Sequence, residues 1–475
     1  MTAAPELPAR VVTVNVGLSA FADALRDQAA PVVQVDWRPP ADGDAEAVDL
    51  LTRLWGRHGD RIAAANAAAV ERIETAGARA LTVAPAGEVV PRLAQGMLLH
   101  SGPPIEWPDV CDPQRRALLA AALFEGWASD REHAARLLER GEIALEPGNE
   151  HDHVGPMTGV CSPSMPVWVV EEPGAGKRAY STLNEGPGRT LWFGVGDDES
   201  IARLRFFRDR LGPWLARLLE HRGPVDVFGL AAEGLNMGDE LHMRSQATGN
   251  LLIRDLAPAI AAIGGEECAR FLAGNHHSFL NLTMAAAKCA SQATDGCTGS
   301  SIVSLMSRNG TSVGIQLAGL PGRWFTAPAA PVQDALLREG HEPDDAALDI
   351  GDSAVIECIG LGGMALAAAP AVASFFSGDA AAAARRTELM AQICAARSTR
   401  FTITSRDAAG TPVGIDARLV VELGITPQIT TGVLHARAGT GQIGAGVAHQ
   451  PVAPFRAALV ALAEALEEQA AARAR

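Results

Sequence analysis

The sequence predicts an α/β protein in which a Rossmann-like N-terminal domain is followed by mixed α+β domains that include a helical subdomain. A strand–helix–strand pattern opens the chain, because Arg10–Val16 and Pro31–Trp37 have strand-like apolar character and Ser19–Gln28 has helical spacing. Farther along, between residues 196 and 275, apolar residues recur at three- and four-residue intervals. A chain of 475 residues exceeds one ordinary core, so roughly two to four packed units are expected.

The expected domains are a Rossmann-like domain (1–95), an α+β domain with polar loops (96–195), a helical subdomain (196–275) and a C-terminal α+β domain (276–475). In the first of these, a helix over Arg61–Thr75 leads into the apolar run Ala80–Ala84, which fits a third parallel strand. The turn after the first strand, Asn15–Leu18, lacks the G-x-G-x-x-G pattern that lets a backbone approach a pyrophosphate. We therefore expect the fold without a nicotinamide nucleotide, and the sequence assigns no other cofactor.

Several further helices follow from spacing and capping residues. A helix is expected over Pro113–Trp127, and the capping box Ser129–Glu132 predicts another that ends near Gly141. The remaining predicted helices are Ile201–Leu211, Trp214–His221, Leu251–Ile263, Glu266–Leu272 and a closing helix from Pro454 to about Gln469. The uncharged stretch Cys358–Gly378 is rich in Ala and Gly and contains Pro370, which favours a buried core helix over a membrane span.

Composition excludes several classes of partner. The formal charge is −15 and lysine occurs only at Lys177 and Lys288, so no basic stripe is available for nucleic acid. The seven cysteines show no C-x-x-C spacing, which favours reduced thiols, and the polar N-terminus has no apolar signal core. The sequence thus predicts a cytoplasmic protein that binds neither nucleic acid nor membrane.

Glycine-punctuated polar loops are dense in this chain, and so many together favour a shared small-molecule site. His151 and His153 are two residues apart and His276 and His277 are adjacent, spacings that can serve metal ligands if loops converge. No established zinc pattern is present, so we favour hydrogen-bonding or acid–base histidines and assign no metal. The run Gly439–Gly446 contains G-x-G-x-x-G, but no helix follows it, and a glycine-rich turn between strands is the better interpretation.

Ten phrases together resemble one family. They are LLHSGPPIEW (Leu98–Trp107), FEGWA (Phe124–Ala128), VGPMTGVCSPSMPV (Val154–Val167), TLNEGPG (Thr182–Gly188), MGDELHMR (Met237–Arg244), FLAGNHHSFLNLTMAAAK (Phe271–Lys288), SLMSRNGTSVGIQLAGL (Ser304–Leu320), DIGDSAVIE (Asp349–Glu357), GTPVGID (Gly410–Asp416) and ITTGVLHARAGTGQIGAG (Ile429–Gly446). The chain resembles the YlbE/YahG-like family from about Arg10 onward, and its best-understood members look like one subunit of oxamate carbamoyltransferase.

The resemblance implies a reaction in which oxalurate and phosphate are interconverted with oxamate and carbamoyl phosphate, as in anaerobic allantoin breakdown. It also implies assembly with an FdrA-like subunit, a third small-family subunit and further copies of the chain. The phrase MGDELHMR departs from a more usual pattern with Cys and Asn, and His276 and Ser278 stand where the family more often has Asp and Phe.

Carbamoyl transfer requires donors for a developing oxyanion, cations for phosphate and carboxylate, and an acid–base group for nitrogen. The candidate proton carriers and carbonyl-polarising groups are His153, His242, His277, Asn184, Asn281 and Asn309. The candidate substrate-binding groups are the fork donors Arg244, Arg308 and Arg323, joined by Asn309, Glu185, Asp239, Glu240 and Asp352. For the arginines the alternative is a buried pair with Asp239, Glu240 or Asp352.

No nucleophilic Ser or Cys stands out, so direct transfer is favoured over a covalent intermediate. Two other functions stay open. One is an amidohydrolase or ligase acting on another ureide or acyl compound, and the other is a non-catalytic scaffold for the FdrA-like partner.

Overall fold

The computed structural model describes residues 12–35, 37–373, 378–437 and 439–473. Its strands are β1 (Thr13–Val16), β2 (Val32–Val35), β3 (Arg79–Pro85), β4 (Met97–His100), β5 (Ala144–Pro147), β6 (Pro166–Glu172), β7 (Lys177–Thr182), β8 (Val225–Asp226), β9 (Val303–Asn309), β10 (Ser312–Leu317), β11 (Leu320–Pro328), β12 (Gln333–Leu337), β13 (Ile350–Gly351), β14 (Cys394–Ile403), β15 (Ala409–Ile415), β16 (Gln428–Leu434) and β17 (Gln442–His449). Its α-helices are α1 (Ser19–Asp27), α2 (Ala45–Trp55), α3 (Gly59–Thr75), α4 (Ala86–Val89), α5 (Asp112–Phe124), α6 (Arg131–Glu139), α7 (Asp198–Phe206), α8 (Gly212–Arg222), α9 (Val227–Leu235), α10 (Gln246–Ile263), α11 (Glu266–Gly274), α12 (Leu280–Gln292), α13 (Pro370–Ala373), α14 (Ala380–Ala391), α15 (Ala417–Leu423) and α16 (Ala453–Arg473).

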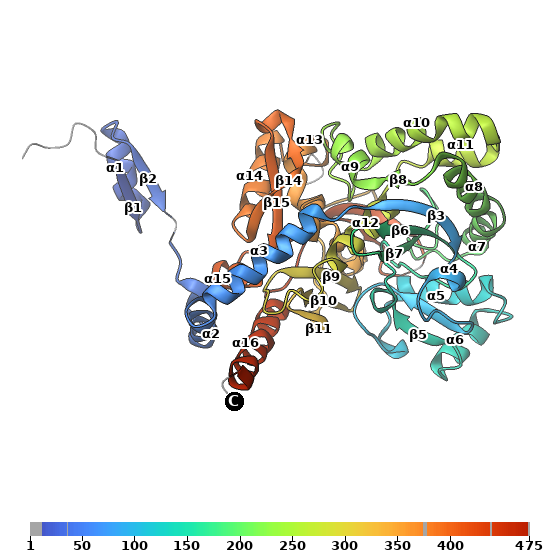
Figure 1. Ribbon diagram of the computed structural model, residues 1–475, viewed down its shortest axis with the longest axis horizontal. Helices are drawn as coiled ribbons and strands as arrows, with labels where there is room; N and C mark the ends of the chain where they lie inside the picture. The colour runs from blue at the N-terminus through green and yellow to red at the C-terminus, as the bar shows by residue number, and fades with distance from the viewer. Residues whose placement is uncertain (1–11, 36, 374–377, 438, 474–475) are drawn as a thin grey trace, which may run out of the picture.

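The N-terminal β1–α1–β2 unit stands apart from the rest of the molecule in Figure 1. Its two strands pair in parallel, as predicted, and form a sheet of their own. The predicted third strand exists as β3, but it pairs antiparallel with β6 and β8. The Rossmann-like domain is therefore not confirmed, because an apolar run identifies a buried strand without identifying its neighbours.

The interior is organised around α12. All residues from Leu280 to Ser291 are buried, and the helix packs against β6 and β7. These strands belong to an antiparallel sheet of order β7-β6-β3-β8, and a second antiparallel sheet has the order β11-β10-β9-β13. The fold is a mixed α/β architecture in which most sheets are antiparallel and α12 is central.

The helices predicted between residues 196 and 275 are confirmed as α7, α8, α10 and α11. Pro213 does not separate two helices, because it lies in the first turn of α8, and a π-helical turn over Phe207–Leu211 joins α7 to it. Helix α6 begins one residue later than its capping box predicted, since Asp130 is the N-cap and accepts the N–H of His133. The domain boundaries remain a prediction.

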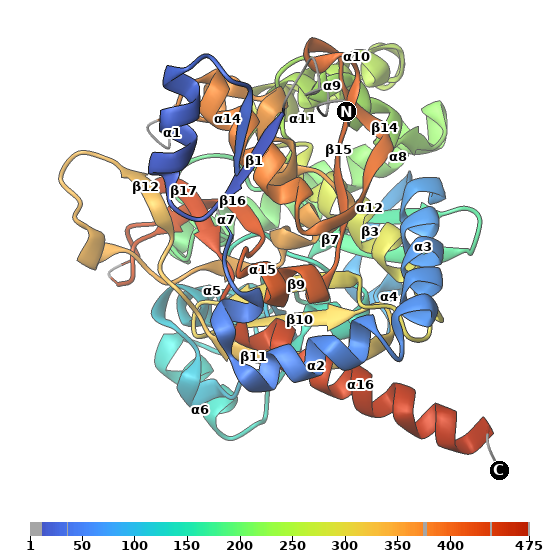
Figure 2. The same cartoon turned by 90° about the vertical axis from the view of Figure 1, so that its left-hand side faces the viewer.

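The C-terminal part contains the antiparallel sheet β12-β17-β16, the β14–β15 ribbon and the closing helix α16, which projects from the body in Figures 1 and 2. The glycine run Gly439–Gly446 begins as a turn after β16, as predicted, and its residues from Gln442 onward already belong to β17. The predicted single helix over Cys358–Gly378 is wrong, although most of its described residues are buried, with Pro370 and Ala371 exposed. The segment is divided into 3₁₀ turns at Glu357–Ile359 and Gly362–Ala368 and the short helix α13. The division arises because Gly360 and Gly362 have positive φ and because Pro370 begins a new helix. Residues 374–377 lie outside the described part of the chain.

Among the helices that the structure describes, none combines the length and the apolar composition that a membrane span requires.

Candidate active site

One cavity of about 580 Å³ collects side chains from separate parts of the body. Its wall contains the arginines Arg244 and Arg338, the histidines His242, His276 and His277, and the aromatic residues Trp192 and Phe193. The other lining residues are Pro156, Met157, Met243, Ser245, Gln246, Leu280, Leu336, Leu337, Ser353, Ala371, Val372, Gly432, Gln442, Gly444 and Ala445. The lining residues in the described chain include no Asp or Glu, so the cavity wall favours anions.

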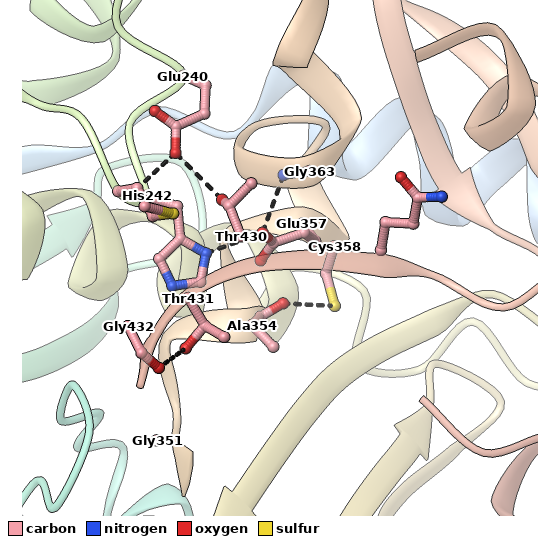
Figure 3. Close-up of polar contacts among 12 residues, drawn as sticks. Glu240, His242, Gly351, Ala354, Glu357, Cys358, Gly363, Thr430, Thr431 and Gly432 are labelled. Carbon is pink, nitrogen blue, oxygen red and sulfur yellow. Dashed lines mark hydrogen bonds and ion pairs between the residues drawn. The ribbon is translucent and has the colours of Figure 1, made fainter. Parts of the chain in front are cut away.

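His242 is held by a carboxylate from another element. Its Nδ1 lies 2.8 Å from Oε1 of Glu357, which is fully buried in the turn before Gly360. The same oxygen accepts the N–H of Gly363 at 3.0 Å. Figure 3 shows the imidazole turned toward Glu357, with its second nitrogen on the opposite edge of the ring. This arrangement fixes the ring and leaves Nε2 available to the cavity.

The loop that carries His242 is shaped by Glu240. The buried carboxylate of Glu240 accepts the N–H groups of Met243 at 2.5 Å and Arg244 at 2.9 Å. It also accepts the hydroxyl of Thr430 on β16, at 3.1 Å (Figure 3). Burial raises the pKa of Glu240, and the two N–H donors and His242 act against that shift. Glu240 therefore shapes the wall and is not among the residues that line it.

Arg244 and Arg338 are the cations of the cavity. The Nε of Arg244 lies 3.2 Å from Oδ1 of Asp239, an ion pair without hydrogen-bond alignment, and its side chain is 39% exposed. Asp239 is itself fully buried and accepts the N–H and hydroxyl of Thr248. Arg338 is exposed, and its guanidinium has no ion pair with any residue in the described ranges. Both guanidinium groups can therefore offer donors to a ligand.

His277 adds a neutral donor or acceptor to the wall. Its Nδ1 is buried and has no hydrogen-bond partner among the described residues. Burial is the main cause that lowers the pKa of His277, and the neighbouring His276 lowers it further. At neutral pH His277 is thus an uncharged imidazole that can bind a polar ligand atom.

Asp352 is fully buried beside Ser353, a lining residue of the cavity. Its carboxylate accepts the N–H of Gly102 at 2.8 Å, the N–H of Gly155 at 3.0 Å and the amide of Asn149 at 2.9 Å, and it also bonds the hydroxyl of Ser307. Burial raises the pKa of Asp352 to about 6, and these donors limit the rise. Asp352 anchors the segment that continues into Pro156 and Met157, whereas its neighbour Ser353 reaches the cavity.

Arg308 and Asn309 are buried outside the cavity wall. The guanidinium of Arg308 is 0% exposed and bonds Asp349 through Nε at 2.7 Å and Nη2 at 3.1 Å, while Nη1 bonds the Gly351 carbonyl at 2.5 Å. Asn309 donates to the carbonyl of Pro103 and caps the following turn, since its Oδ1 accepts the N–H groups of Thr311 and Ser312. Arg308 thus forms a buried ion pair, which was the alternative to a substrate-binding role. Its partner is Asp349 and not one of the three carboxylates expected from the sequence.

Asn184, Asn281 and Glu185 hold the segment that leads to Trp192. Asn184 donates to Oδ1 of Asn281 at 3.0 Å, and Asn281 in turn donates to the Thr182 carbonyl at 2.7 Å. The Glu185 carboxylate accepts the N–H groups of Leu191 at 2.8 Å and Trp192 at 3.2 Å. Burial raises the pKa of Glu185 to about 7. These side chains position the aromatic part of the wall from outside it.

His153 and Arg323 complete the predicted set. His153 is fully buried, its two ring nitrogens lack hydrogen-bond partners in the described chain, and burial lowers its pKa to about 3. Arg323 is exposed on β11, with its guanidinium carbon 5.4 Å from the ring centre of Phe325. Of the predicted residues, the structure thus brings His242, His277 and Arg244 into the cavity wall.

Sequence reasoning missed Glu357 as a site residue. The available signal was a single carboxylate inside the apolar run Ala354–Leu361, where a buried charge requires a specific partner. Arg338 was missed too, because it follows an ordinary strand pattern, although Gly340 lies two positions after it just as Gly310 does after Arg308. His276 lines the cavity as well, although it was not among the predicted site residues.

One group of side chains has metal-ligand spacing within the described ranges, namely His341, Asp345 and His435. Both imidazoles lie 3.7 Å from the Asp345 carboxylate. Nδ1 of His435 accepts the N–H of Arg437 at 3.0 Å, so in a neutral ring the proton is on Nε2, the atom that faces Asp345. A metal at Nε2 would need that proton on Nδ1, so the geometry fits two imidazoles placed beside a carboxylate better than a metal site. Neither predicted histidine pair belongs to this group.

The fold and the cavity define a mixed α/β protein with a cationic, histidine-bearing pocket that can bind a small anion. The family model described as oxamate carbamoyltransferase subunit AllG matches residues 143–353. The chain is 43% identical over 414 residues to oxamate carbamoyltransferase subunit AllG of Escherichia coli K12, covering 85% of this chain and 98% of that protein. It therefore belongs to the AllG/YahG family.

Two other relatives agree with this membership. Protein YahG of Escherichia coli K12, named as uncharacterized, is 38% identical over 457 residues, covering 95% of this chain and 97% of that protein. A crystal structure of a conserved protein of unknown function from Enterococcus faecalis V583 has a TM-score of 0.83 and 36% identity, and covers 85% of this chain and 98% of that chain.

Proposed function

We propose that this chain is a catalytic subunit of a carbamoyltransferase that interconverts oxalurate plus phosphate and oxamate plus carbamoyl phosphate. The observation that carries the proposal is the cavity wall, which joins two arginines and three histidines and includes no carboxylate among the described lining residues. All four substrates and products are anions, so such a wall attracts each of them. The similarity to an oxamate carbamoyltransferase subunit supports this choice of anions.

In this proposal the two arginines divide the anionic groups between them. Arg244 and Arg338 come from different elements, and a planar guanidinium matches either a carboxylate or a phosphate by two parallel hydrogen bonds. One arginine therefore holds the oxamate carboxylate and the other holds the phosphate. His277 is uncharged at neutral pH and lies on the same wall, which suits it to bind the carbamoyl oxygen.

The proposal includes a complex. The name of the AllG relative describes a subunit, and we propose that this chain likewise works in the cytoplasm with an FdrA-like subunit and with further copies of itself. No cofactor is proposed. The other predicted residues that are buried are proposed to contribute by holding the fold around the substrates. They are His153, Arg308, Asn184, Asn281, Asn309, Glu185, Asp239, Glu240 and Asp352. The exposed Arg323 has no proposed contact with a substrate.

The test is an assay of phosphate release from carbamoyl phosphate and oxamate, with the partner subunits present. Arg244→Gln and Arg338→Gln each remove one charge-assisted contact, and we expect turnover to fall about 30- to 1000-fold. Arg217→Gln is the matched control, because Arg217 is exposed on α8 and lies outside the cavity. An inactive wild-type complex would remove the oxamate assignment.

A second assay and the arginine variants separate the alternatives. An amidohydrolase would hydrolyse a ureide such as oxalurate without any need for phosphate. A scaffold subunit would leave the turnover of the complex unchanged in both arginine variants.

A further inference from the structure

His242 and Glu357 form a buried pair whose hydrogen-bond pattern sets the position of a proton. The Oε1 atom of Glu357 accepts from the Gly363 N–H at 3.0 Å and lies 2.8 Å from Nδ1 of His242. An oxygen that already accepts one N–H acts as a carboxylate acceptor, so Nδ1 of His242 carries its proton toward Glu357. In the neutral ring, Nε2 is then the unprotonated nitrogen.

The carboxylate of Glu357 is enclosed beside the imidazole of His242. Glu357 is 0% exposed, and its second oxygen has no hydrogen-bond partner among the described residues. A Cβ atom on Gly362 would come within 2.2 Å of Oε1, so the glycine lets the backbone pass close to the carboxylate. The N–H of Gly362 also bonds the Glu240 carbonyl at 2.7 Å, which ties this turn to the loop of His242.

We propose that His242 and Glu357 are the proton-transfer pair of the cavity, an inference that rests on the carbamoyl transfer proposed above. In the forward direction a hydrogen-phosphate oxygen bonds to the carbamoyl carbon of oxalurate, and the bond from that carbon to the nitrogen of the oxamate group breaks. Nε2 of His242 takes the proton of hydrogen phosphate and gives it to the departing nitrogen. The products are carbamoyl phosphate and oxamate, and the pair returns to its starting protonation. Glu357 stabilises the imidazolium that forms between the two steps.

Charges from several elements act on His242. Glu357 faces the imidazole from the turn after β13. The loop of His242 itself carries Asp239, Glu240 and Arg244. The segment between α11 and α12 carries His276 and His277. The carboxylates favour the imidazolium, whereas Arg244 and the other histidines oppose it. Among the carboxylates, Glu357 alone is in hydrogen-bond contact with the ring.

The decisive experiment compares pH–rate profiles of the assembled complex, measured from carbamoyl phosphate and oxamate. In that direction unprotonated His242 is the base, so the acidic limb of the profile reports its protonation. His242→Gln should lower turnover about 100- to 10,000-fold and remove that limb. Glu357→Gln should move the limb to lower pH, because the imidazolium loses its adjacent anion.

Matched controls are His221→Gln and Glu220→Gln, both exposed at the end of α8. Circular dichroism and the melting temperature of every variant establish that it is folded. In ¹⁵N-histidine NMR spectra of the complex, the Nδ1–H signal of His242 should be present in the wild type and shift in Glu357→Gln.

The outcomes separate the two proposals. A wild-type complex that does not use this substrate pair overturns the proposed function. An active wild type with a His242→Gln variant of similar rate and unchanged acidic limb overturns the proton-transfer pair alone. An NMR spectrum with the proton on Nε2 also overturns it.

Discussion

The sequence around Arg308 is typical of a ligand-binding residue, whereas its packing in the structure indicates that it stabilises the fold. Glycine follows it by two positions, which is typical of an exposed binding turn. In the structure its guanidinium donates hydrogen bonds to the Asp349 carboxylate and the Gly351 carbonyl, and the whole side chain is buried. Its local pattern could not reveal this, because Asp349 lies 41 positions away.

We expect Arg308→Met to lower the free energy of unfolding by roughly 3–5 kcal/mol, since it leaves the Asp349 carboxylate buried without its partner. Arg308→Lys should also destabilise the protein, because lysine cannot reproduce the two-point contact. Urea unfolding measures both effects, with Arg217→Met as the exposed control. If Arg308→Lys keeps the wild-type stability and loses turnover 30-fold or more, Arg308 contacts a substrate and the structural role is excluded.

The segment from Asn184 to Phe193 shows how one buried carboxyl can hold an irregular element. Glu185 accepts two N–H groups at the far end of the segment, next to the two aromatic residues of the cavity wall. Burial raises its pKa to about 7, while the two N–H donors and Arg203 oppose that rise. The folded protein therefore binds this proton more tightly than the unfolded chain does.

It follows that the free energy of unfolding should fall as pH rises from the ordinary range of a Glu carboxyl toward about 7. The loss attributable to Glu185 is roughly 3 kcal/mol over that interval. Glu185→Gln should remove this part of the slope, so the variant gains stability relative to the wild type at pH 8 compared with pH 4. Urea unfolding at both pH values measures the difference, and parallel stability curves for the two proteins would contradict the assignment.

At the level of elements, periodic apolar patterns were sufficient to predict individual helices and insufficient to predict which strands pair with each other. Helices α3, α5 and α10 were predicted because their apolar spacing reflects burial of one face. The strand at Ala80–Ala84 was also found, but its partners are β6 and β8, which lie far along the chain. The stretch Cys358–Gly378 misled the prediction because an apolar composition reports burial and says little about the backbone at Gly360 and Gly362.

At the scale of the whole molecule, the candidate site depends on contacts between distant segments. His242, His277 and Arg244 could be anticipated because each lies in a polar phrase with unusual chemistry. Glu357 reaches His242 across 115 positions, and no local pattern encodes that distance. His153 and Arg308 are of the same residue types as the lining residues His242 and Arg244, yet both are buried outside the cavity wall. Residue type alone therefore does not identify a lining residue.

The N-terminal β1–α1–β2 unit bears on how the whole chain unfolds. Its strongest contacts are those among its own three elements, and Figure 1 places it away from the body. Val14, Val16 and Val33 are 61%, 58% and 55% exposed on one face of its two-stranded sheet, whereas parallel sheets are normally covered on both faces. A two-stranded sheet of this kind is at best marginally stable, so it should add little to the main unfolding transition.

We therefore expect deletion of residues 2–38 to leave the melting temperature of the body within about 3 °C of the wild-type value, because a change below 1 kcal/mol shifts a chain of this size only slightly. The cavity should stay intact, since none of its described lining residues belongs to the deleted segment. Leu54→Ala is the contrasting variant, because Leu54 of α2 is fully buried in the body and its truncation should cost about 2–5 kcal/mol. Differential scanning calorimetry of the three proteins measures the effect, with phosphate binding by titration as a second readout. A deletion variant that melts as early as Leu54→Ala, or that loses phosphate binding shown by the full chain, would mean that the unit is integral to the folded body.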